Sequence, residues 1–227
     1  MSVAGLFPAA AQWLSGTHIA VVTSVADPLS LARVQVQIVA ADPEGLAPIW
    51  ARVAVPFAGD NYGAFLVPDV GAEVLVVFPA GDSAHPIVIG ALWNGRTAVP
   101  ESLRADAVDR WTLTGRNGTR IAIVEEASGQ ELVEIETPAG ATATLSDGAG
   151  GAIELKVGSN TLTMDGEGIA MKTSNAFSVE ASTISLKAST VDVTTPQATF
   201  SMAVDCKTFT AVSITSGTYS PGAGNVW

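Results

Sequence analysis

Two groups of side chains in this sequence have the types and spacing that catalysis or ion binding requires. His85 follows Asp82 and Ser83 within one short loop, and a histidine beside a carboxylate and a hydroxyl is the set used in nucleophilic catalysis. Paired carboxylates serve glycoside hydrolysis or cation binding, and a dense acidic stretch contains Glu125, Glu126, Glu131, Glu134 and Glu136. Whether either group does chemistry depends on the elements that hold it.

The local patterns favour structural roles. Residues 81–86 have the composition of a hairpin turn. Alternation in residues 131–136 places the glutamates on the wet face of outer strands, where charge keeps a stacked sheet soluble. Residues 148–151 resemble a phosphate-binding loop, but no helix or lysine follows them, so we predict a tight turn. Cys206 has no second cysteine to pair with and is predicted to be a small buried residue.

The composition excludes several functional classes. The 227 residues are 48% hydrophobic and 15% charged, with 11 Lys and Arg against 22 Asp and Glu and a net charge of −11. Because the cations do not cluster, nucleic-acid binding is not expected. The first 15 residues lack a positive segment, and no apolar run approaches the roughly 20 residues of a membrane span, so neither a signal peptide nor a span is predicted. The apolar residues must be buried in a fold or between chains.

The first half of the chain has the pattern of five short strands separated by turn residues. The segments are 18–23, 32–39, 50–55, 73–78 and 86–90. Strands of this length and spacing predict a small antiparallel barrel or sandwich over residues 17–96. Residues 1–16 form an N-terminal arm, which packs on the barrel or docks on a partner. Residues 97–111 are predicted to be a polar linker with up to one helical turn.

Beyond Trp111, short alternating segments recur with only turn residues between them. From Ile153 to Phe209 the first apolar residues of successive segments are spaced by 9, 7, 8, 7, 7, 9 and 9. Repeats this short predict a β-solenoid or an intertwined β-prism over residues 112–227. A single-chain β-helix uses about 20 residues per turn, so we expect a homotrimer in which the hydrogen-bond ladders and the apolar axis lie between chains.

The predicted trimer core contains the apolar residues that recur in phase along these segments. They are Ile153, Leu155, Leu162, Met164, Ile169, Met171, Phe177, Val179, Ile184, Leu186, Val191, Val193, Phe200 and Met202.

Three motifs in a fixed order carry a family resemblance. They are Pro-x-x-Gly-x-Glu-Val-Leu-Val-x-Phe at 68–78, Gly-Asp at 81–82 and Pro-x-Val-x-Gly-x-Leu-x-Asn at 86–94. This combination resembles the OB-like barrel of contractile-tail spike proteins, namely phage baseplate assembly protein V and VgrG proteins. The repeats after Trp111 are similar to the triple-stranded β-helix of that family. The resemblance implies an all-β chain, with a five-stranded OB-like barrel followed by an intertwined triple-stranded β-helix, a trimeric needle.

The resemblance also implies a mechanical function. Such a homotrimer is the central spike of a contractile baseplate, connects the hub and inner tube to the tip, and pierces the target envelope when the sheath contracts. It implies no catalytic, cofactor or metal residues, transient contact with the target membrane, and a cytoplasmic location until assembly into a phage tail or injection particle. The loop around His85 is then a turn without catalysis.

Departures from the family pattern predict the partners. Residues 1–16 are too few for a hub domain, so a separate hub protein is expected at the barrel end. The linker is too short for a lysozyme-like insertion. Because the only histidines are His18 and His85, we expect no metal-capped apex but a PAAR-type tip protein at the C-terminal end. Its predicted interface is Pro221, Asn225, Val226 and Trp227, and Trp227 also has the option of plugging the needle core.

Two other functions fit an acidic trimeric β-structure. One is a trimeric glycan-binding module like those of tail fibres, and the other is a polysaccharide-cleaving enzyme on a β-helix. Glycan-active proteins place aromatic and acidic side chains on exposed strand faces. After Trp111 the aromatics are few and lie in phase with the inward apolar residues, which favours the spike.

Overall fold

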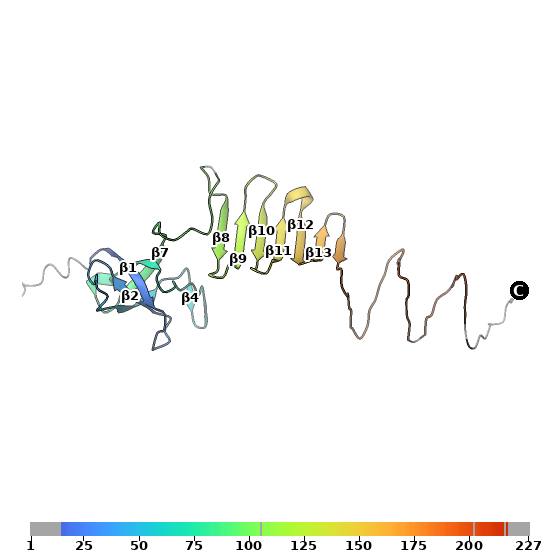
Figure 1. Cartoon of the computed structure of the whole chain (residues 1–227), viewed down its shortest axis with the longest axis horizontal. Coiled ribbons are helices and arrows are strands. Elements are labelled where there is room, and N and C mark those ends of the chain that lie inside the picture. The colour runs from blue at the N-terminus through green and yellow to red at the C-terminus, as the bar shows by residue number, and fades with distance from the viewer. Residues whose placement is uncertain (1–14, 105, 202, 216, 218–227) are drawn as a thin grey trace, which may run out of the picture. The chain divides into compact units, whose positions relative to one another are not determined.

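The structure of this chain is a computed structural model that describes residues 15–104, 106–201, 203–215 and 217 (Figure 1). The chain divides into two compact units at residue 177, and each is described by itself. The first unit contains a barrel, a connecting segment and a seven-stranded sheet.

Five strands close into the barrel. They are β1 (Thr17–Ser24), β2 (Val34–Ile38), β3 (Ile49–Val53), β6 (Glu73–Val77) and β7 (Ile87–Leu92). Their order is β1-β2-β3-β7-β6, and β6 pairs with β1 to close the ring. The predicted barrel differs in one respect, because β3 and β7 run parallel. A closed ring with an odd number of strands cannot be antiparallel throughout.

Alternation along the strands fills the barrel. In β2, Val34 and Val36 are buried, whereas Gln35 between them is partly exposed. In β6, Val74 and Val76 are fully buried in the same way. Because successive side chains of a strand point to opposite faces, a period of two directs one set inward. The barrel core consists of Ala20, Val22, Val34, Val36, Ile38, Ala51, Val74, Val76, Phe78 and Val88.

A separate hairpin lies between β3 and β6 in the chain. It pairs β4 (Ala58–Gly59) with β5 (Tyr62–Gly63) as a two-stranded sheet of its own. Asn61, with a φ of 60°, is in the left-handed region that the tight reversal requires. The turn residues at 59–61 therefore build a small hairpin.

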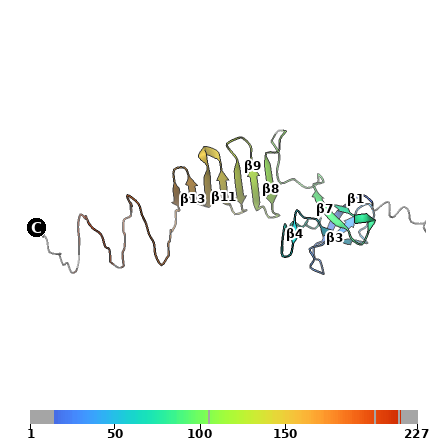
Figure 2. The same cartoon turned by 180° about the vertical axis from the view of Figure 1, so that it is seen from behind.

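Seven strands in sequence order form one antiparallel sheet (Figures 1 and 2). They are β8 (Arg110–Thr114), β9 (Arg120–Val124), β10 (Leu132–Glu136), β11 (Ala141–Ser146), β12 (Ala152–Val157), β13 (Asn160–Asp165) and β14 (Ile169–Lys172). The expectation that ladders lie between chains is wrong for this segment, because each strand pairs with its neighbour in the same chain. Short glycine turns cause the difference: Gly118, with a φ of 90°, donates to the Gly115 carbonyl and reverses the chain.

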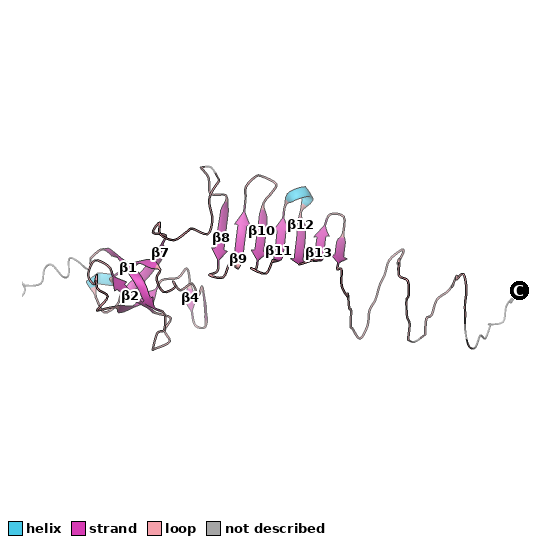
Figure 3. Ribbon diagram, in the orientation of Figure 1, coloured by secondary structure: helices cyan, strands magenta, loops and turns pink. Residues whose placement is uncertain are grey.

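The described parts of the chain are all-β (Figure 3). Their two helical elements are short turns, η2 (Pro79–Gly81) and η3 (Gly148–Gly150). The described residues of the predicted linker contain no helix, and β8 begins at Arg110.

No strand is present among the described residues after Lys172. The segments that begin at Phe177, Ile184, Val191 and Phe200, predicted to be strands, therefore have no ladder within a single chain. Strands need a hydrogen-bonded partner, and this part of the chain does not fold back on itself to supply one.

We predict that Val76→Ala lowers the free energy of unfolding of the barrel by about 2 kcal/mol, because it removes two buried methyl groups and leaves a cavity. Urea unfolding followed by tryptophan fluorescence measures the change. Val39→Ala is the matched control, since Val39 is half-exposed. Equal effects of the two substitutions would contradict the assignment of the core.

Candidate functional site

One side of the β8–β14 sheet carries its large apolar residues. The strand registers align them opposite one another, so that two unbroken rows cross all seven strands. The first row is Trp111, Ile123, Val133, Leu145, Ile153, Met164 and Ile169. The second row is Leu113, Ile121, Ile135, Ala143, Leu155, Leu162 and Met171. We call these residues the apolar face.

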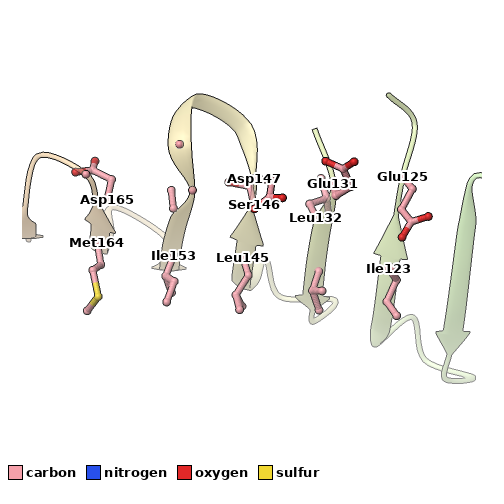
Figure 4. Close-up of a pocket in the computed structure, with 15 residues that line it drawn as sticks. Ile123, Glu125, Glu131, Leu132, Leu145, Ser146, Asp147, Ile153, Met164 and Asp165 are labelled. Carbon is pink, nitrogen blue, oxygen red and sulfur yellow. The ribbon is translucent and has the colours of Figure 1, made fainter. Parts of the chain in front are cut away.

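The apolar face is open to water in the single chain. Figure 4 shows Ile123, Leu145, Ile153 and Met164 projecting to the same side from their strands. These four residues are 39–49% exposed. A continuous exposed apolar surface of this kind marks an interaction site in a soluble protein.

The apolar face contains part of the predicted trimer core. Six predicted residues lie on it, namely Ile153, Leu155, Leu162, Met164, Ile169 and Met171. The predicted residues from Phe177 to Phe200 are exposed and follow the last strand. Met202 and the predicted tip interface, Pro221, Asn225, Val226 and Trp227, lie outside the described residues. Sequence reasoning missed the apolar residues of β8 to β11, although alternation of apolar residues with glutamate in 133–136 marks those of β10.

The opposite side of the sheet is polar. One of its rows is Thr112, Ala122, Glu134, Thr144, Glu154, Thr163 and Ala170, and another is Thr114, Arg120, Glu136, Thr142, Lys156, Thr161 and Lys172. Glu134 and Glu136 lie on this side as predicted, and Glu136 is exposed, whereas Glu134 is only partly exposed. We call this side the polar face.

Charged contacts tie the segment before β8 to the polar face. We call this segment, residues 97–104 and 106–109, the strap. Arg120 of β9 donates to Glu101 of the strap at 2.6 Å and to Glu134 of β10 at 2.8 Å. The Arg120 side chain is 20% exposed, so water screens these contacts only in part. One guanidinium thus joins the strap to two neighbouring strands.

A second arginine holds the end of the strap. Arg110 donates to the two oxygens of Asp109 at 2.9 and 3.2 Å and to Glu126 at 2.6 Å. Glu126 also pairs with Arg104 of the strap. Sequence reasoning treated Glu126 only as a wet carboxylate and missed this network, because its partners come from the predicted linker.

The network lowers the pKa of two of its carboxylates. The hydrogen bond from Arg120 holds the pKa of Glu101 below its usual value, and the hydrogen bond from Arg110 does the same for the pKa of Asp109. Carboxylates with a lowered pKa are poor proton donors at neutral pH. Glu126 and Glu134, the two members of the acidic stretch that join this network, have a structural use as the ion-pair partners of Arg110 and Arg120.

The histidine loop is a closed turn. His85 Nδ1 lies 2.6 Å from Asp82 Oδ2, and the Ala84 N–H donates to Asp82 Oδ1 at 2.8 Å. The hydrogen bond with His85 holds the pKa of Asp82 below its usual value. Both side chains are at least half exposed, so the pair shapes the loop on the surface of the barrel.

The remaining carboxylates lie near strand ends. Glu125, Glu131, Asp147 and Asp165 border an open groove of about 670 Å³ (Figure 4). In the described residues, no three His, Cys, Asp or Glu side chains are grouped to hold a metal ion.

Three smaller features complete the described surface. Residues 148–150 form the predicted tight turn. Cys206, predicted to be buried, is exposed in the single chain because the segment around it is not packed. No helix within the described ranges is long and apolar enough to cross a membrane.

Comparison with known proteins identifies relatives of the barrel. Residues 18–93 match the family of the type VI secretion system/phage-baseplate injector OB domain. The type VI secretion system spike protein VgrG1c of Pseudomonas aeruginosa is 40% identical over 63 residues, which are 28% of this chain and 9% of that protein. VgrG4b of the same organism is 35% identical over 88 residues, which are 37% of this chain and 11% of that protein.

A third spike protein is similarly related. VgrG3 of Vibrio cholerae is 41% identical over 54 residues, 24% of this chain and 5% of that protein. The chain therefore matches about a tenth or less of the length of these relatives.

We predict that Arg120→Gln lowers the stability of the sheet by about 1–3 kcal/mol at pH 7, because Glu101 and Glu134 lose their shared cation. Urea unfolding followed by circular dichroism measures the change, with exposed Arg96→Gln as the control.

The same substitution tests the pH dependence. A carboxylate with a lowered pKa stabilises the folded state above its unfolded pKa, about 4.3 for Glu, and this contribution is lost as pH falls through the lowered value. The difference between wild type and variant should shrink below about pH 4. A difference that persists unchanged at pH 3 would argue against the ion pair.

Proposed function

We propose that this chain is the structural central spike of a contractile injection machine, because residues 18–93 match the injector OB-domain family. In this role it is a homotrimer that connects the hub and inner tube to the tip. It pierces the target envelope when the sheath contracts. The machine is a phage tail or an extracellular contractile injection particle, and the spike is cytoplasmic until it is assembled.

The apolar face is the observation that carries this proposal. The backbone ladders of β8 to β14 are complete within one chain, so copies can pack through side chains without breaking strand pairs. Burial contributes about 25 cal/mol per Å² of apolar surface. The strap is tied to the polar face, which leaves the apolar face for the interface. Three copies around one axis turn three apolar faces inward and form a closed prism.

The segments after Lys172 support threefold winding. Phe177, Ile184, Val191 and Phe200 are exposed in the single chain, and the described residues around them form no strand. Their unpaired backbone groups would gain partners from two other copies wound about the same axis. In this proposal residues 17–96 form the barrel, 97–111 the linker and 112–227 the trimeric β-helical needle.

We assign one proposed partner to each end of the chain. The barrel end binds the hub, and the C-terminal end binds a PAAR-type tip protein through Pro221, Asn225, Val226 and Trp227. The spike has no enzymatic role and does not bind nucleic acid, which its net charge of −11 would repel.

The composition of the apolar face favours the spike over a glycan-binding module. Sugar sites combine aromatic platforms with polar groups that hydrogen-bond hydroxyls. Thirteen of the fourteen residues of the apolar face are not aromatic, and Trp111 is the exception. Such a surface is suited to packing against another apolar face.

We predict that light scattering of the purified protein gives three times the chain mass of 23.1 kDa. Leu155→Glu should abolish the trimer, because it places a charge in the buried face. Glu154→Gln on the polar face of the same strand is the control and should leave the mass unchanged. A monomeric or dimeric wild type would refute the proposal.

We also predict that deletion of residues 220–227 abolishes capture of the tip protein in a pull-down while the trimer mass is kept. Trp227→Ala should weaken capture, since terminal aromatic side chains supply the apolar seat. Unchanged capture by the truncated trimer would remove the C-terminal seat from the proposal.

A further inference from the structure

One loop of the barrel is held rigidly by a buried carboxylate. Asp27, whose side chain is 4% exposed, accepts two guanidinium hydrogen bonds from Arg33 at 3.1 and 2.7 Å. It also accepts the backbone N–H of Leu31 at 2.9 Å. The hydrogen bond from Arg33 is the main reason that the pKa of Asp27 lies far below its usual value. The loop of residues 27–33 is therefore preorganised.

The same loop stores backbone strain and exposes apolar groups. Ser30 and Ala32 both have a φ of 54°, which is uncommon for residues with a Cβ. Such conformations persist only where the surroundings enforce them, and they cluster at functional sites. The loop nevertheless turns Leu29 and Leu31 into solvent, where each is more than 60% exposed.

The β4–β5 hairpin is built in a similar way. A Cβ on Gly59 would lie 2.2 Å from the Tyr62 ring, so that ring rests directly on the glycine backbone. Gly63 has a φ of 153°, and a Cβ there would lie 2.9 Å from the Phe57 carbonyl oxygen. The packing fixes the hairpin, yet Phe57, Tyr62 and Phe65 are 59%, 69% and 81% exposed.

The loop and the hairpin border one groove of about 590 Å³. Leu31 lines it from the loop, and Phe57, Tyr62 and Phe65 line it from the hairpin. Arg52 of β3 adds an exposed cation to the lining. Among the described residues, no carboxylate forms an ion pair with Arg52. The groove is thus apolar with one unneutralised positive charge.

We infer that this groove binds the hairpin tip of a second copy of the barrel, with Asp60 of that copy facing Arg52. This inference rests on the proposed trimer. A cyclic trimer needs two different complementary patches on each barrel, because every copy meets two neighbours through unlike surfaces. Asp60 does not line the groove, although its neighbours Gly59 and Asn61 do, so Asp60 and the groove are two adjacent but different patches on each barrel. Asp60 lies at the tip between β4 and β5 and is exposed. Its negative charge is complementary to the positive charge of Arg52.

Chemical cross-linking of the full-length chain tests the contact. Cys206→Ser removes the exposed natural thiol, and Arg52→Cys with Asp60→Cys adds one thiol on each side of the proposed contact. A short bis-maleimide should shift the denatured chain from the mass of one copy to that of three copies. The matched control combines Arg52→Cys with Glu44→Cys, an exposed carboxylate that does not line the groove, and should stay at one-chain mass.

The outcomes separate this inference from the proposed function. A native trimer that yields a covalent trimer supports both. A native trimer that remains at one-chain mass after denaturation, or that cross-links only within a chain, overturns the barrel contact and leaves the spike standing. A native monomer overturns the spike itself.

Charge reversal provides a second measurement that needs no cross-linker. Arg52→Glu and Asp60→Lys should each lower the melting temperature of the barrel in the trimer, and the double variant should recover most of the loss. Additive losses in the double variant would contradict a direct pairing. If the groove instead binds a different protein, the single variants will melt like the wild type, which also overturns the inference.

Discussion

An antiparallel sheet of one layer has two faces, and its backbone hydrogen bonds cover neither of them. In the β8–β14 sheet the ladders are satisfied strand by strand within the chain, so the backbone needs no partner. The apolar side chains are not buried within the sheet, because alternation directs two complete rows of them to the same side. The sheet pairs its strands within one chain but cannot bury its apolar face within that chain. The proposed trimer would bury this face, and the proposed spike function depends on that burial.

The ion pairs near β8 lie on the polar face of the sheet, opposite the apolar face. Arg110 and Arg120 tie the strap to the polar face. They donate hydrogen bonds to Glu101 of the strap and to Glu126 and Glu134 of the acidic stretch. The strap thus lies against one face of the sheet, while the apolar face stays exposed in the single chain. Two carboxylates of the stretch that looked like a reactive cluster, Glu126 and Glu134, instead form ion pairs with Arg110 and Arg120. In the same network the arginines hold the pKa values of Glu101 and Asp109 below their usual values.

Unlike the sheet, the barrel buries its apolar side chains within one chain. Its five strands close on themselves and bury a valine-rich core, so it requires no partner to fold. Its unusual surface features are additions to that core: a loop strained around Asp27, and a hairpin in which Tyr62 rests on Gly59. Both hold large apolar side chains in solvent in the single chain. In the proposed trimer these surface features are available for contact between barrels.

The sequence alone determined the all-β class, the five barrel strands and the in-phase apolar residues from Ile153 to Met171, because a period of two and turn residues are local signals. The order of the motifs at 68–94 was also sufficient to identify the family of the barrel. Only the tertiary structure decided the parallel pair β3–β7, the intrachain ladders of the sheet and the strap network. These features depend on which segments meet in space. Alternation reports which side of a strand is apolar, but it does not report which strand lies beside it.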